Sequence, residues 1–290
     1  MIPAPFDYHA PATLPEAIGL LAKHRDTAKV LSGGQSLLPL LKLRLGQVEH
    51  LVDIGRIPGL EYIREERGVL RIGGRTREAA LEASDIIRTR YPILLDTAKV
   101  IADPLVRNRA TIGGNLAHGD PGNDHPATML ALGAEVVATG PKGERTIPVK
   151  DFFVGIFTTA LQPDEILTEI RIPAPPPRSG GAYFKLERKV GDYATAAAAA
   201  QLTLGAGGAV ERCGMALTNV GPTPVHALAA AQEIVGKKPT DEVIVKAARA
   251  AAAFATPNPD RRGSEEYKRE MSRVLMTRAL KKAVERAGGH

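Results

Sequence analysis

The sequence of 290 residues contains a single cysteine and no tryptophan. Cys213 has no partner for an intramolecular disulfide, and one cysteine cannot ligate an iron–sulfur cluster or form a Cys-x-x-Cys zinc or redox motif. No uninterrupted apolar stretch approaches the roughly 18 residues of a membrane span, and the N-terminus lacks the basic start and apolar stretch of a signal peptide. We therefore expect a cytoplasmic protein, with attachment at the inner face of the membrane left open.

The excess of basic residues is small and local. Lysine and arginine number 38 against 32 acidic residues, a net charge of +6, and residues 261–290 hold nine basic and four acidic residues, or +5 of that charge. Basic segments that bind nucleic acid interleave aromatic side chains for stacking, and this stretch offers only Tyr267. The composition therefore argues against a nucleic-acid partner.

The length predicts about two domains at roughly 150 residues each. Residues 172–181 combine a stiff proline run with two glycines, which is typical of an interdomain linker. Hydrophobic periodicity and turn residues predict a mixed α+β fold on both sides of it. The expected helices cover residues 13–24, 37–43, 77–87, 92–102, 126–132, 225–235, 241–255 and 264–287. The expected strands cover residues 28–31, 51–54, 60–64, 69–72, 135–138, 166–172, 183–189, 194–204, 209–212 and 215–220.

One of these segments carries conflicting signals. Alanine is the best helix former, yet the alanine-rich residues 194–200 lead into a strand-like segment and a glycine-rich turn at residues 205–208. Because residues 209–212 and 215–220 have the pattern of strands that could pair with this segment across the turn, we predict that residues 194–204 form a strand.

Two glycine-rich segments are candidates for ligand binding: Ser32-Gly33-Gly34-Gln35-Ser36 and Thr111-Ile112-Gly113-Gly114-Asn115. Glycines let backbone amides approach a ligand, and with hydroxyl or amide side chains they can form an anion-binding nest for phosphate. Either segment alone is also compatible with an ordinary turn. The Rossmann and P-loop signatures are absent from the sequence.

A polar loop at residues 118–125 is open to two interpretations. It could simply cap the following helix, since Asp and Asn are common capping residues. Alternatively, Asp124 could accept a hydrogen bond from a ribose or ribityl hydroxyl. The spacing of the loop does not indicate a metal site, and we predict no metal ligands in this chain.

Four motifs in a fixed order resemble one known family. They are residues 32–39 (SGGQSLLP), residues 109–117 (RATIGGNLA), residues 161–167 (LQPDEIL), and Phe184-Lys185 with residues 191–194 (GDYA). Together they resemble the FAD-binding medium subunits of the molybdenum hydroxylases, which include xanthine dehydrogenase and aerobic carbon monoxide dehydrogenase. The resemblance covers essentially the whole chain.

The resemblance implies an FAD-binding domain of the vanillyl-alcohol-oxidase (PCMH) type over residues 1–175, in two parts at about 1–55 and 56–175. An α+β C-terminal domain with a small antiparallel sheet and three helices would follow over residues 180–290. In such a domain the two glycine-rich segments cradle the FAD pyrophosphate through amides and hydroxyls, an acidic residue contacts the ribityl chain, and three side chains lie beside the isoalloxazine. The positions implied are Ser32, Gly33, Gly34, Gln35, Ser36 and Leu37; Thr111, Gly113, Gly114 and Asn115; Asp124; and Leu161, Lys185 and Tyr193.

One departure concerns Gln35, where many relatives carry a histidine that can attach the flavin. Glutamine cannot form that link, so the FAD is expected to be noncovalent. The resemblance implies an electron-transfer role beside a molybdopterin-binding large subunit and a [2Fe–2S] small subunit, in a dimer of heterotrimers. No substrate-converting residue is then expected in this chain. The alternatives are a stand-alone FAD oxidase or dehydrogenase of the same fold acting on a small alcohol or sugar, and a nonenzymatic nucleotide-binding module.

Overall fold

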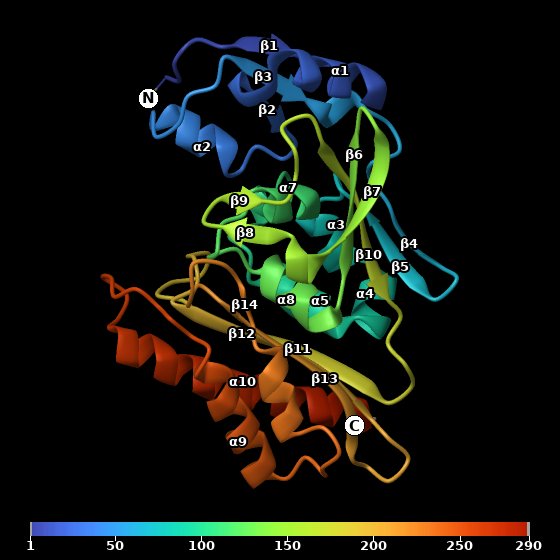
Figure 1. Ribbon diagram of the computed structural model, residues 1–290, viewed down its shortest axis with the longest axis vertical. Helices are drawn as coiled ribbons and strands as arrows, with labels where there is room; N and C mark the ends of the chain where they lie inside the picture. The colour runs from blue at the N-terminus through green and yellow to red at the C-terminus, as the bar shows by residue number, and fades with distance from the viewer. Residues whose placement is uncertain (1, 289–290) are drawn as a thin grey trace.

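Three parallel strands and two helices form the N-terminal unit of the computed structural model, which describes residues 2–288 (Figure 1). The sheet order is β1-β3-β2, and α1 packs against it through a small core that includes Leu21 and Val52. Thr13 caps α1 as predicted, because its hydroxyl accepts a hydrogen bond from the Glu16 amide at 3.4 Å. The elements are β1 (Asp7–His9), α1 (Leu14–His24), β2 (Ala28–Leu31), α2 (Leu37–Lys42) and β3 (His50–Asp53), with 3₁₀ turns at Arg25–Thr27 and Ile54–Arg56.

A five-stranded antiparallel sheet forms the middle unit, in the order β4-β5-β10-β6-β7. Its strands are β4 (Ile63–Glu66), β5 (Val69–Gly73), β6 (Glu135–Gly140), β7 (Gly143–Pro148) and β10 (Ile166–Pro173), beside a hairpin of β8 (Phe153–Gly155) and β9 (Thr158–Thr159). Its helices are α3 (Glu78–Ala83), α4 (Asp85–Arg90), α5 (Pro92–Lys99), α6 (Pro104–Arg107), α7 (Ile112–Ala117) and α8 (His125–Leu132), with a 3₁₀ turn at Val149–Asp151.

The C-terminal unit is a four-stranded antiparallel sheet whose helices α9 and α10 cover the side away from the middle unit (Figure 1). The strands are β11 (Ser179–Leu186), β12 (Ala196–Leu204), β13 (Val210–Thr218) and β14 (Val225–His226). The helices are α9 (Asp241–Ala252) and α10 (Glu265–Gly288), preceded by a 3₁₀ segment at Leu228–Glu233.

The alanine-rich segment forms a strand, as predicted, because helices cover both of its faces. Along β12, Ala197 and Ala199 belong to the core shared with the middle unit, whereas Ala196, Ala198 and Ala200 belong to the core under α9 and α10. Small side chains allow this close approach on both sides, and the packing outweighs a helix preference of under about 0.7 kcal/mol per residue.

Two glycines fix how closely helices approach this sheet. A Cβ on Gly180 would lie 2.2 Å from the Ala283 carbonyl oxygen of α10, and one on Gly214 would lie 2.1 Å from the Ala131 carbonyl oxygen of α8. Gly180 was expected in a flexible linker, but it lies inside β11, and the connection between β10 and β11 is limited to residues 174–178.

Three further expectations differ from the structure. The helix predicted over residues 77–87 is two helices, since Ser84 ends α3 and caps α4. The helix predicted over residues 225–235 is wrong: Val225 and His226 pair with β13 instead, and a 3₁₀ segment follows. The two short strands predicted between residues 209 and 220 form one continuous strand, β13.

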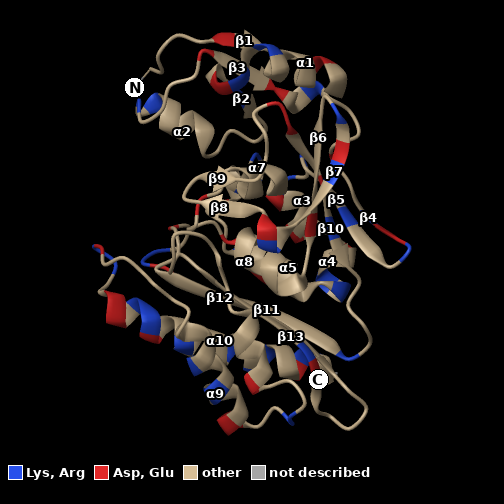
Figure 2. Cartoon of the chain, in the orientation of Figure 1, with Lys and Arg blue, Asp and Glu red and all other residues tan. Residues whose placement is uncertain are grey.

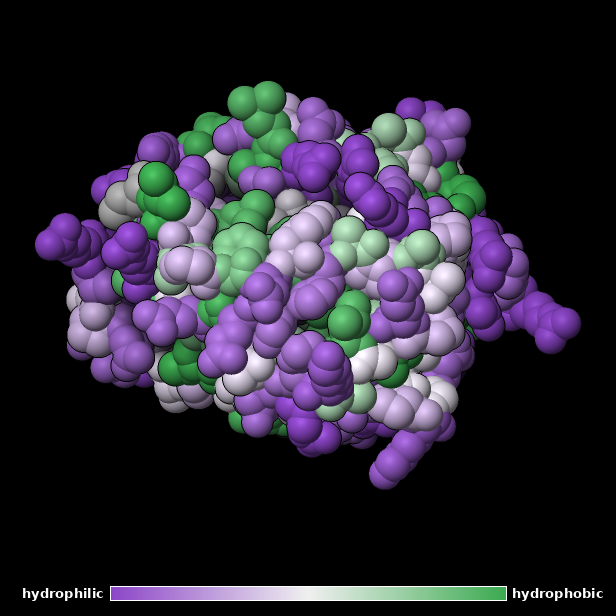
Figure 3. Space-filling model, turned by 90° about the horizontal axis from the view of Figure 1, so that it is seen from above, coloured by the Kyte–Doolittle hydropathy of each residue, from purple (hydrophilic) through white to green (hydrophobic). Residues whose placement is uncertain are grey.

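Most charges of the C-terminal helix are paired within the chain, and acidic and basic residues alternate along α10 (Figure 2). Arg286 contacts Asp96 of α5 at 2.6 Å, and Lys268 is buried against Asp260 at 3.0 Å. Within residues 2–288, none of the helices combines the length and hydropathy that a membrane span requires. Seen from above, the surface is mainly hydrophilic with small, separate hydrophobic areas (Figure 3).

Candidate flavin site

The first glycine-rich segment is a tight connection between β2 and α2. Gly34 has φ +78°, a left-handed conformation that side chains disfavour. A Cβ on Gly33 would lie 2.3 Å from the Arg109 carbonyl oxygen, so this position packs directly against the chain that leads into α7. Both glycines are therefore required by the fold itself.

The amides of residues 33–37 have no hydrogen-bond acceptor among the described residues. These five consecutive N–H groups come before the first intrahelical bond of α2, in which the Leu38 amide donates to the Gly34 carbonyl oxygen at 3.1 Å. Successive unpaired amides form a concave donor surface of the kind that binds phosphate. The segment thus has the unpaired amides that an anion-binding nest requires.

The second glycine-rich segment forms the first turn of α7. Thr111 caps this helix, since its hydroxyl accepts from the Gly114 amide at 3.2 Å, and the amides of Ile112 and Gly113 donate to carbonyl oxygens of the preceding chain at 3.0 Å. The Asn115 amide donates to the Thr111 carbonyl oxygen at 2.9 Å. Amides free for a phosphate are therefore found at residues 33–37 and not here, and this segment can contribute side chains.

The two segments meet through their side chains. The hydroxyls of Ser32 and Thr111 lie 2.9 Å apart, although 79 residues separate them in the sequence. The Asn115 side-chain oxygen is buried and has no hydrogen-bond partner in the described part of the chain. A buried acceptor without a partner costs about 1–3 kcal/mol, so this atom indicates a missing donor.

Asp124 lies at the start of α8 and joins the middle unit to the C-terminal sheet. Its carboxylate accepts hydrogen bonds from the Tyr183 hydroxyl at 2.6 Å and from the Lys185 ammonium at 3.0 Å. Lys185 also donates to the Val100 carbonyl oxygen at 2.9 Å. Burial raises the pKa of Asp124, partly opposed by Lys185, and it raises the pKa of Tyr183 well above its ordinary value. The carboxylate is thus held rigidly between three elements.

The last two implied positions lie in different surroundings. The Tyr193 side chain is 45% exposed, and a Cβ on Gly122 would lie 3.1 Å from its ring. Burial raises the pKa of Tyr193, and the neighbouring Ser36 hydroxyl opposes that shift, which places this ring beside the first segment. Leu161 follows β9 and packs its half-buried side chain against the main core. Gln35 is exposed, and its side-chain amide donates to the Gly33 carbonyl oxygen at 3.4 Å.

Comparisons with known proteins agree over nearly the whole chain. The family described as the FAD binding domain in molybdopterin dehydrogenase matches residues 4–175, and the CO dehydrogenase flavoprotein C-terminal domain matches residues 181–283. The chain belongs to this FAD-binding family. The family inferred from the four sequence motifs is confirmed, as are the mixed α+β fold and the class of oxidoreductase flavoprotein subunits.

Individual relatives match at full length. The medium chain of carbon monoxide dehydrogenase from Hydrogenophaga pseudoflava is 47% identical, with 98% of each chain covered, and that from Afipia carboxidovorans is 46% identical, with 99% of each covered. A solved structure of the Hydrogenophaga pseudoflava carbon monoxide dehydrogenase superposes with a TM-score of 0.96 at 49% identity, covering 99% of both chains.

The residues present fit the FAD of this family. An FAD carries a pyrophosphate that needs hydrogen-bond donors, which the amides of residues 33–37 supply. It also carries ribityl and ribose hydroxyls, which can donate to the unpartnered Asn115 oxygen. Both requirements are met where Ser32 and Thr111 bring the two segments together.

Two supporting residues escaped the sequence analysis. Tyr183 holds Asp124, and the Asn123 side chain donates to the Asn115 carbonyl oxygen at 2.7 Å. The alternation along residues 183–189 places a tyrosine and a lysine on one face of a strand, but only the packing of β11 on α8 reveals which carboxylate they meet. The fully buried pair of His125 and Glu78, 2.7 Å apart, was also missed because the two residues are far apart in sequence.

Proposed function

We propose that this chain is the FAD-carrying electron-transfer subunit of a three-component molybdenum hydroxylase similar to carbon monoxide dehydrogenase. Electrons would arrive from the [2Fe–2S] clusters of a small subunit, after a molybdopterin-binding large subunit has oxidised the substrate, and would leave to an external acceptor. The observation that carries the proposal is the row of unpaired amides at residues 33–37, together with the unpartnered Asn115 oxygen on the segment that the Ser32–Thr111 contact joins to it. The full-length likeness to carbon monoxide dehydrogenase medium chains supports it.

The chain's own residues hold and orient the cofactor. The amides of residues 33–37 and the hydroxyls of Ser32 and Thr111 would bind the pyrophosphate, and Asp124 would accept from the ribityl chain. Lys185 and Tyr183 keep that carboxylate in place, so Lys185 would act mainly through Asp124. Bound FAD supplies a centre that exchanges electrons singly or in pairs.

Two further residues would lie beside the isoalloxazine. Tyr193 presents an exposed aromatic face next to the first segment, and Leu161 presents an apolar side chain. Aromatic and apolar groups pack favourably on flat rings. Since Gln35 offers no imidazole, we propose that the FAD is noncovalent.

The hairpin of β8 and β9 is our proposed docking surface for the iron–sulfur subunit. Val154, Ile156 and Phe157 are each more than half exposed at its tip. The hairpin is tied to the end of α7, because the Phe157 amide donates to the Gly119 carbonyl oxygen at 2.9 Å. Exposed apolar groups of this kind often mark protein interfaces. From the resemblance of the chain to its family we also propose that the whole complex is a dimer of heterotrimers and that it is located in the cytoplasm.

A stand-alone oxidase is the less favoured interpretation, because full-length relatives such as the carbon monoxide dehydrogenase and nicotine 6-hydroxylase proteins are medium chains or subunits by name.

The proposed function is tested by recording the visible spectrum of the purified chain, alone and after incubation with FAD and desalting. The same spectrum is then recorded for its co-expressed complex with the large and small subunits. We expect a flavin spectrum in the complex and release of all FAD on denaturation. A complex that transfers electrons without any flavin would overturn the proposal.

A further inference from the structure

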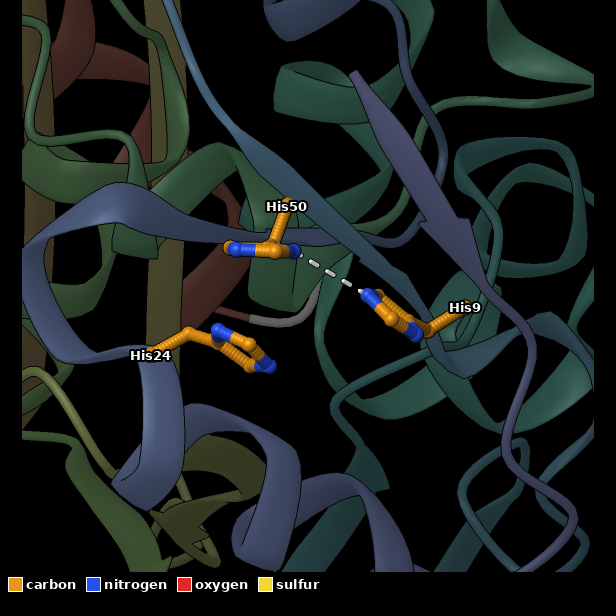
Figure 4. Close-up of side chains that lie close together, drawn as sticks. All are labelled: His9, His24 and His50. Carbon is orange, nitrogen blue, oxygen red and sulfur yellow. Dashed lines mark hydrogen bonds between the residues drawn. The ribbon is translucent and has the colours of Figure 1, made fainter.

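Three histidines from three different elements converge at one edge of the N-terminal unit (Figure 4). His9 ends β1, His24 ends α1 and His50 begins β3. One nitrogen from each ring lies within 4.8 Å of the others. All three side chains are partly exposed, so solvent reaches the cluster.

The strand register explains why they meet. In the parallel pairing of β1 with β3, Asp7 aligns with His50 and His9 with Val52, so these four residues point to the same face of the sheet. Val52 packs in the core beneath α1, which covers that face. His24, in the last turn of α1, therefore ends above the two strand histidines.

The spacing of the nitrogen atoms suits a metal ion. His9 Nε2 and His50 Nδ1 are 3.3 Å apart. Two imidazole nitrogens bound to one tetrahedral Zn²⁺ at about 2.0–2.1 Å stand roughly 3.4 Å apart. The His24 ring lies against that of His50, with 3.6 Å between centroids and a tilt of 36°, and one of its nitrogens lies within 4.8 Å of the other two ligand atoms.

A negative charge completes the donor set. The Asp7 carboxylate lies 3.5 Å from His50 Nδ1. Its side chain is 75% exposed and can move toward an ion. Three imidazoles and one carboxylate, or a water in its place, are ligands that zinc prefers.

The cluster is separate from the flavin site. His50 pairs with Ala28 at the start of β2, whereas residues 32–36 leave the opposite end of that strand. This cluster could not be predicted from the sequence, because the three histidines are 15 and 26 residues apart and match no known ligand spacing.

We propose that His9, His24 and His50 form a Zn²⁺ site, with Asp7 or a water molecule as the fourth ligand. Such an ion links β1, α1 and β3, and β3 is the strand with which β1 pairs in the N-terminal sheet. Its chemical role is structural, because a ligand that binds only the folded state shifts the equilibrium toward folding.

The test uses the full chain, without a histidine tag and treated with a chelator, titrated with ZnCl₂ at constant pH in a calorimeter. We expect one ion per chain, and at least tenfold weaker binding in both His24→Asn and His50→Asn. His226→Asn is the matched control, because this half-buried histidine lies on β14 away from the cluster, and it should bind Zn²⁺ as the unaltered chain does. Circular dichroism checks that each variant folds.

Substitution of Co²⁺ for Zn²⁺ provides a second measurement on the unaltered chain. Intense visible bands typical of tetrahedral Co²⁺, lost in His24→Asn, would support the proposal. It is overturned if the unaltered chain binds no Zn²⁺ at millimolar concentration, or if His24→Asn and His50→Asn keep full affinity. Flavin binding should be the same in these variants, so failure here leaves the proposed function untouched.

Discussion

Replacing Asn115 by leucine should weaken flavin binding without weakening the fold. The side-chain oxygen of Asn115 is buried without a partner in the described residues, and leucine has the same branching at Cγ and a better helix propensity within α7. Removing a buried acceptor that lacks a partner relieves a desolvation cost of about 1–3 kcal/mol. The apoprotein should therefore be as stable as the unaltered chain or slightly more stable.

The cofactor-bound state should respond in the opposite direction. Removing the acceptor leaves the cofactor hydroxyl that it binds unsatisfied in a buried place, which costs about 1–3 kcal/mol. Because 1.4 kcal/mol corresponds to a factor of ten, loss of the Asn115 contact predicts a dissociation constant for FAD raised by roughly 5- to 150-fold. Only a side chain that contacts the ligand produces this pair of opposite effects.

The assay combines two measurements on each variant: quenching of FAD fluorescence on titration with the apoprotein, and thermal unfolding of the apoprotein alone. Gln232→Leu is the matched control, since it makes the same kind of change at an exposed helical position in the C-terminal unit. It should alter neither quantity. If Asn115→Leu bound FAD within twofold of the unaltered chain, Asn115 would not face the cofactor and our argument from its unpartnered oxygen would fail.

Three further predictions concern the fold and the flavin surroundings. Gly214→Ala should destabilise the chain by about 1–3 kcal/mol in chemical denaturation, because the added Cβ would overlap the backbone of α8. Gly207→Ala is the control at an open position and should change stability by under about 0.5 kcal/mol. Equal effects of the two substitutions would contradict the packing of β13 on α8. Burial raises the pKa of Asp124, so the stability that its protonated form contributes is lost as pH rises from about 4 through the raised pKa. The unfolding free energy of the unaltered chain, measured relative to that of Asp124→Asn, should therefore fall over that pH range. A rise would show that the ion pair with Lys185 outweighs the effect of burial. Tyr193→Ala should weaken FAD binding by up to about tenfold through a lost aromatic contact of about 0.5–1.5 kcal/mol. Its effect on apoprotein melting should be small, since the side chain is 45% exposed.

Local signals in the sequence were sufficient for elements whose ends are set by their own residues. Thr13 starts α1, and the alternation around residues 66–68 gives the hairpin of β4 and β5. The alanine strand β12 was also predicted, because the turn and the strand partner after it outweighed the helix propensity of alanine. In each case the deciding residues lie within about ten positions of the element.

Elements decided by distant contacts were not predictable in this way. Residues 225–235 look helical, but pairing of His226 with Ala216 of β13 wins over a preference of a few tenths of a kcal/mol per residue. Similarly, the ion pair of Lys185 and Asp124 spans 61 residues, and the contact of Ser32 with Thr111 spans 79. The motifs supplied the candidate site residues, whereas the packing of β11 on α8 determines what Asp124 and Lys185 contact.

The most direct test of the central claim is an experimental structure of this chain, or of its complex, with FAD bound. Our account predicts pyrophosphate oxygens within hydrogen-bond distance of amides among residues 33–37, and a flavin or ribose hydroxyl on the Asn115 side chain, with no covalent bond to Gln35. A pyrophosphate placed away from residues 33–37, with those amides still unpaired, would contradict it.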